Sequence, residues 1–82
     1  MSTPFIKRYY HVHRAEIGYL RFILESYDGL IFMRTLDPHA ALIEVAHPPS
    51  RRPDADALLL ALASEVSMDE APAPLPGSYS PL

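Results

Sequence analysis

Two short apolar runs flank a turn sequence in the middle of this chain of 82 residues. Residues 30–36 (LIFMRTL) form a run too short for a stable helix, and turn residues bound it on both sides. Asp37 suits the first position of a turn, and Pro38 presets the backbone of the second. Residues 41–47 (ALIEVAH) can therefore return beside the first run, and the sequence predicts an antiparallel hairpin.

A strand and a helix are expected before this hairpin. Residues 5–13 (FIKRYYHVH) are rich in aromatic and β-branched residues, which favour a strand. Residues 14–27 carry apolar residues at the spacing of one helical face, namely Ile17, Leu20, Leu24 and Tyr27. Gly29 can adopt the positive φ that often ends a helix. Gly18 lowers helix propensity, so its presence inside the segment predicts close backbone packing.

A second helix is expected after Pro48-Pro49, within residues 50–66 (SRRPDADALLLALASEV). Ser50 or Asp54 can serve as its N-cap, and Pro53 suits the first turn, where a missing N–H is harmless. Four apolar residues predict its buried stripe: Leu58, Leu59, Leu62 and Val66.

The order of these elements, β-α-β-β-α, predicts an α+β fold. A right-handed crossover makes the first two strands parallel, and the third strand can lie between them, antiparallel to both. The result is a three-stranded antiparallel sheet of order 1-3-2 with two helices on one face. This arrangement is a ferredoxin-like fold truncated before its last strand.

Several motifs in the predicted domain resemble a known family. They are YLRFILE in the first helix, YDGL at its end, RTLDP in the hairpin and the leucine-rich second helix. Together, over about residues 8–65, they are similar to a family of small uncharacterised bacterial proteins that contain a domain of unknown function. The resemblance implies a compact ferredoxin-like or ACT-like domain with no assigned activity.

The composition changes near residue 67. Residues 67–82 (SMDEAPAPLPGSYSPL) hold four of the nine prolines and few large apolar residues, which predicts a disordered tail after a domain of residues 1–66. Deleting residues 68–82 is then expected to shift the midpoint of thermal unfolding (Tm) by less than about 3 °C. A short docking peptide is the alternative, with three apolar anchors: Leu75, Tyr79 and Leu82.

The composition and motifs disfavour catalysis. The chain has no cysteine, which excludes disulfides, cysteine-based zinc sites and a thiol nucleophile. It has three glycines and neither a nucleophile elbow nor a phosphate-binding glycine motif. We therefore expect a protein that is not an enzyme and has no cofactor.

The charge and the N-terminal residues bear on partners and location. Seven basic residues against ten acidic ones give a net charge of −3, which disfavours unselective binding of nucleic acids. Residues 7–10 (KRYY) resemble the RNA-binding patch of ferredoxin-like sheets, but the third strand offers no aromatic partner and carries Glu44. Residues 1–14 have no apolar signal region, and no segment is long and apolar enough for a membrane helix. A cytoplasmic protein that does not enter membranes is expected.

An incomplete sheet predicts an interaction surface. Without a fourth strand, the first and second strands both have unpaired edges. Along residues 30–36, both alternating sets of side chains are substantially apolar, so the face away from the helices is apolar whichever set it carries. We expect a non-catalytic interaction module, homodimeric or docked on a larger protein, whose interface includes Tyr9, His11, Leu30, Phe32, Met33 and Leu42.

Histidines suggest an alternative function. His11 and His13 alternate onto one face of the first strand, and His47 ends the neighbouring third strand, so the three could bind a divalent metal ion. Exposed histidines without a ligand are the simpler interpretation. An ACT-like sensor of small ligands is a further alternative, although the loop of residues 13–16 lacks the glycine that such sites contain.

Overall fold

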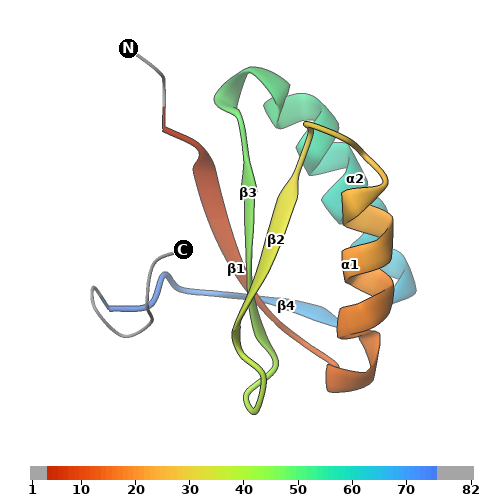
Figure 1. Ribbon diagram of the computed structural model, residues 1–82, viewed down its shortest axis with the longest axis vertical. Helices are drawn as coiled ribbons and strands as arrows, with labels where there is room; N and C mark the ends of the chain where they lie inside the picture. The colour runs from red at the N-terminus through yellow and green to blue at the C-terminus, as the bar shows by residue number, and fades with distance from the viewer. Residues whose placement is uncertain (1–3, 76–82) are drawn as a thin grey trace.

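The computed structural model describes residues 4–75, which form a four-stranded antiparallel sheet and two helices (Figure 1). The elements in chain order are β1 (Ile6–Val12), α1 (Ile17–Glu25), β2 (Phe32–Asp37), β3 (Leu42–His47), α2 (Arg52–Glu65) and β4 (Met68–Ala71). Short 3₁₀ turns, Arg14–Glu16 and Pro49–Arg51, lead into the two helices. Both helices cover the same face of the sheet (Figure 1).

The strand order is β2-β3-β1-β4, so the α+β class and the expected order of the first three strands are confirmed. The expectation of only three strands is wrong, because Met68–Ala71 pairs antiparallel with β1. The first proline after α2 is Pro72, so the backbone N–H groups of these four residues are free to join the sheet. The expectation of disorder from residue 67 onward is therefore wrong for β4. Residues 76–82 lie outside the described residues.

The central hairpin forms at the expected turn. The Asp37 carboxylate accepts hydrogen bonds from the backbone N–H groups of His39 and Ala40, at 3.0 and 3.1 Å. Ala41 follows with a φ of 53°, and the register between β2 and β3 shifts between Thr35 and Asp37. The turn residues thus pair the two strands at their expected place.

The helices differ from the expected ones mainly at their ends. Helix α1 ends at Glu25 rather than Tyr27, and Gly29 has the positive φ, 76°, in the turn that follows. A Cβ on Gly18 would meet nothing within 4 Å, so the expectation of close packing there is wrong. Helix α2 has Arg51 at its N-cap and no side-chain cap, in place of the two expected candidates.

The core lies between the sheet and the two helices. Its fully buried side chains come from both layers: Leu20 and Leu24 from α1, Ile43 and Val45 from β3, and Leu62 from α2. Alternation along the strands fixes the face that carries them. Within residues 4–75, neither helix is long and apolar enough to cross a membrane.

Candidate protein interaction surface

The sheet face opposite the helices carries residues that alternate with the core residues along each strand. The register places Lys7, Tyr9 and His11 of β1 directly opposite Ala46, Glu44 and Leu42 of β3, so these six side chains share one face. Phe32 and Arg34 of β2 and Asp69 and Ala71 of β4 join them through their own pairings. We call this set of ten residues the open sheet face.

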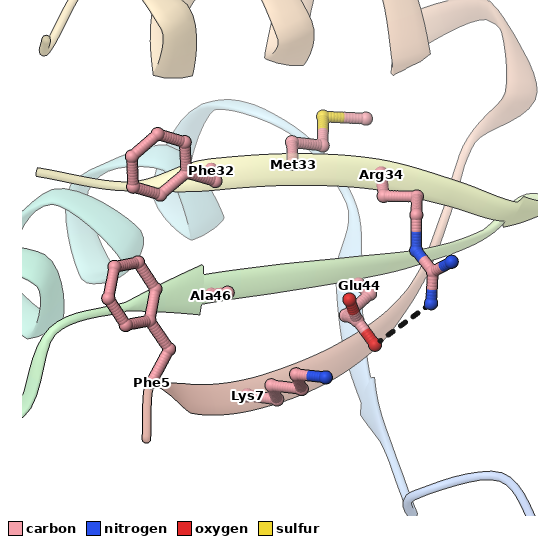
Figure 2. Close-up of a pocket in the computed structure, with 7 residues that line it drawn as sticks. All are labelled: Phe5, Lys7, Phe32, Met33, Arg34, Glu44 and Ala46. Carbon is pink, nitrogen blue, oxygen red and sulfur yellow. Dashed lines mark hydrogen bonds and ion pairs between the residues drawn. The ribbon is translucent and has the colours of Figure 1, made fainter. Parts of the chain in front are cut away.

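Two phenylalanines mark one end of the open sheet face. Phe5 precedes β1 and Phe32 begins β2; their ring centroids are 5.6 Å apart, with an angle of 34° between the planes. The two side chains border a hollow of about 380 Å³, whose floor includes Ala46. Figure 2 shows both rings over the end of β3. Phe5 is 43% exposed and Phe32 50% exposed, so an aromatic pair is presented to solvent.

A polar row crosses the middle of the same face. Glu44 on β3 lies between Tyr9 on β1 and Arg34 on β2. Its carboxylate pairs with the Arg34 guanidinium at 3.5 Å, and both side chains are largely buried (Figure 2). Burial raises the pKa of the Tyr9 hydroxyl, and the charge and hydrogen bond of Glu44 raise it further. The row places an ion pair at the centre of the open sheet face.

A second hollow lies at the other end of the open sheet face. Its volume is about 390 Å³, and His11, Ala40 and Leu42 line it together with the segment of residues 71–75. Residues 72–75, which follow β4, lie on the side of the sheet opposite the helices (Figure 1). Leu42 is only 7% exposed, whereas Leu75 is 79% exposed. This end of the face is therefore partly covered by the chain itself.

The structure brings together four of the six residues expected in an interface. Tyr9, His11, Phe32 and Leu42 lie on the open sheet face. Met33 packs against the core instead, because it alternates with Phe32 along β2. Leu30 precedes β2 and is a buried member of the core.

Sequence reasoning left out several residues of this surface: Phe5, Lys7, Arg34 and Glu44. Strand alternation could have found all four. Lys7 lies two residues before Tyr9, Arg34 lies two residues after Phe32, and Glu44 lies two residues after Leu42. Phe5 lies two residues before Lys7 in the expected strand, and only its contact with Phe32 across β3 needed the tertiary structure.

The structure does not bring the three candidate metal ligands together. His11 and His47 lie at opposite ends of the β1–β3 pair, where His11 faces Leu42 and His47 faces Ile6. His47 is fully buried, and its Nδ1 lies 3.1 Å from the carbonyl oxygen of Pro48. His13 is exposed just before α1. Within residues 4–75, no three histidine or carboxylate side chains are grouped so that they could hold a metal ion.

Comparison with known proteins assigns the chain to a family. Residues 10–66 match the model of a family described as a domain of unknown function (DUF4911), and this match covers more than half of the chain. It confirms the predicted resemblance to an uncharacterised domain family. No curated protein and no solved structure matches the chain. The chain thus belongs to the DUF4911 family.

Proposed function

We propose that this protein is a non-catalytic interaction module whose open sheet face binds a second copy of the same chain. The observation that carries the proposal is the exposed pair of Phe5 and Phe32 beside a charged centre on a sheet face that no helix covers. The element order and sheet order support a ferredoxin-like arrangement, in which one sheet face is free for binding.

The charges on the open sheet face favour a second copy as the partner. In a two-fold symmetric dimer the same patch is used twice, so it must supply both members of each complementary pair. Lys7 and Asp69 provide one cationic and one acidic group on this face, beside the Arg34–Glu44 pair, which is already formed within the chain. A small domain without disulfides also gains stability by association.

The size of the face sets the expected strength of binding. Four strands about 4.8 Å apart, with about seven residues at ~3.3 Å each, give a face of roughly 19 by 23 Å. Two such faces bury roughly 900 Å², below the ~1,200–2,000 Å² of stable specific interfaces. We therefore expect a weak, transient dimer.

Sedimentation velocity from about 1 to 500 µM tests the proposal. The mass should rise from 9.2 kDa toward that of two chains. Phe32→Glu should abolish this rise, because it replaces one ring of the aromatic pair with a charged side chain. Phe22→Glu is the matched control, because Phe22 is a 71% exposed phenylalanine on α1, and α1 covers the opposite face of the sheet (Figure 1).

Circular dichroism must show that both variants are folded. A 9.2 kDa species at every concentration, for the full chain and for a chain ending at Leu75, would refute self-association. Equal loss of the dimer in Phe22→Glu and Phe32→Glu would refute the assignment of the interface to the open sheet face.

A further inference from the structure

The hollow of about 380 Å³ beside Phe5 and Phe32 has the size of a small-molecule site, for which ~300–1,000 Å³ is typical. The two phenylalanines form one end of it. Figure 2 shows both rings beside Ala46, whose short side chain leaves room above β3. Because half-exposed rings gain from contact with another ring, this end of the hollow suits a flat aromatic group.

The other end of the hollow carries one positive charge in excess. Lys7 and Arg34 line it together with Glu44, whereas the whole chain has a net charge of −3. The Glu44 carboxylate is already engaged, because Arg34 pairs with it at 3.5 Å and the Tyr9 hydroxyl donates a hydrogen bond to it. Lys7 is exposed and forms no ion pair with any of residues 4–75. The free charge at this end is therefore a single ammonium group.

We propose that the hollow binds a small aromatic monocarboxylic acid, whose ring packs against Phe5 and Phe32 and whose carboxylate pairs with Lys7. The register places Phe32 and Lys7 on either side of Ala46, two strand spacings or about 10 Å apart between Cα atoms. The ring and the carboxylate must therefore be joined through a short chain that passes over Ala46. One carboxylate matches the single excess charge, whereas a phosphate monoester brings about −1.5 to −2.

This ligand deepens the proposed function, and the inference rests on that function for its location, since both use the open sheet face. One chain supplies every residue that lines the hollow, so the ligand binds the monomer. The bound ring covers the aromatic pair that a second copy would contact. The acid should therefore lower the fraction of dimer at a given protein concentration.

NMR titration of the ¹⁵N-labelled full chain, at a concentration where it is monomeric, tests the site with 3-phenylpropionate as the probe. The backbone amide signals of Lys7, Phe32 and Ala46 should shift and reach saturation. Two matched compounds separate the contributions, because 3-phenylpropionamide lacks the charge and propionate lacks the ring. The amide should bind about two- to fivefold more weakly, as expected for the loss of an exposed ion pair, and propionate should give no saturable shift.

Substitutions in the protein give the second test. Lys7→Gln should weaken binding of the acid about two- to fivefold and leave binding of the amide unchanged, a difference that a merely structural change would not produce. Arg14→Gln is the matched control, because Arg14 is an exposed cation in the 3₁₀ turn after β1 and does not line the hollow. Phe32→Leu should weaken binding of both compounds about two- to tenfold through the lost ring contact, whereas Phe22→Leu on α1 should not.

The outcomes separate this proposal from the proposed function. Equal affinity for the acid and the amide, or no saturable shift with either, overturns the ligand site. Tighter binding of phenyl phosphate than of 3-phenylpropionate overturns the assignment to a carboxylate. A chain that binds the acid but never dimerises in sedimentation velocity retains the ligand site and refutes the proposed function. A chain that dimerises through the open sheet face without binding the acid refutes the ligand site alone.

Discussion

Strand β4 should contribute measurably to stability, although it has only four residues (Met68–Ala71). The decisive comparison is between a chain that ends at Leu75 and one that ends at Ser67. Both lack residues 76–82, and only the shorter one loses β4. The pairing of β4 with β1 predicts that the shorter chain is less stable, in contrast to the small effect expected from composition alone.

The magnitude follows from what β4 covers. Met68 packs against the core but is partly exposed. Its burial therefore contributes about half of the ~1.5–3 kcal/mol of a fully buried side chain, or about 1 kcal/mol. Met68 lies opposite Val12, and uncovering about 40 Å² of apolar surface there loses about another 1 kcal/mol. The ladder hydrogen bonds, at ~0.5–1.5 kcal/mol each, are largely offset by ~1–2 kcal/mol of ordering entropy per residue. The sum is about 2 kcal/mol, or a Tm lower by about 8–16 °C.

Thermal and urea unfolding followed by circular dichroism measure this difference. In the chain that ends at Leu75, Met68→Ala should lower the free energy of unfolding by about 1 kcal/mol. Asp69→Ala, at an exposed residue of the same strand, should change it by less than about 0.5 kcal/mol. A Tm difference below about 3 °C between the two truncated chains would refute the reasoning, because β4 would then add nothing to the packing of β1.

Three further perturbations test other parts of the structure by urea unfolding. Gly18→Ala should stabilise the protein by up to about 1 kcal/mol, because α1 has room for the methyl group. Gly29→Ala should destabilise it by about 1 kcal/mol, because the φ of Gly29 is 76°. Equal effects of the two substitutions would contradict this reasoning. The folded protein raises the pKa of Tyr9, so the stabilising contribution of this group is complete below the ordinary value near 10 and is lost as the pH rises through the folded value. Tyr9→Phe should therefore reduce the loss of stability between about pH 9 and 12. An unchanged pH profile of stability would contradict this role of Tyr9. Glu44→Gln should lower stability by about 1 kcal/mol, because Arg34 loses an anionic partner in a largely buried pair; a neutral effect would mean that the pair does not stabilise the sheet.

Local signals in the sequence predicted most of the elements. The turn at Asp37-Pro38 fixed the hairpin, because its carboxylate satisfies the backbone of the residues that follow. The apolar spacing that includes Leu20 and Leu24 located α1, since a period of 3.6 residues is visible in any helix with one buried face. Helix ends were less accurate, because α2 begins without a side-chain cap that the sequence could reveal.

The candidate surface was predicted only in part. The alternation of residues 30–36 left two possible outward sets open, and the packing of Met33 on the helices decided that Phe32 and Arg34 face outward. The tertiary structure also decided the environment of His47, because this residue lies on the face of the sheet that the helices cover and is fully buried.

By itself, the sequence determined the α+β class, the hairpin and the two helices, because each depends on periodicity or turn chemistry within a short segment. The order of the first three strands followed from these elements and the right-handed crossover between the first two strands. Only the tertiary structure decided that Met68–Ala71 is a strand and that Phe5 meets Phe32. Residues 68–71 (MDEA) have little strand propensity of their own. Their conformation is stabilised by pairing with β1, more than fifty residues away in the chain, and an interaction over that distance leaves no pattern in the local sequence.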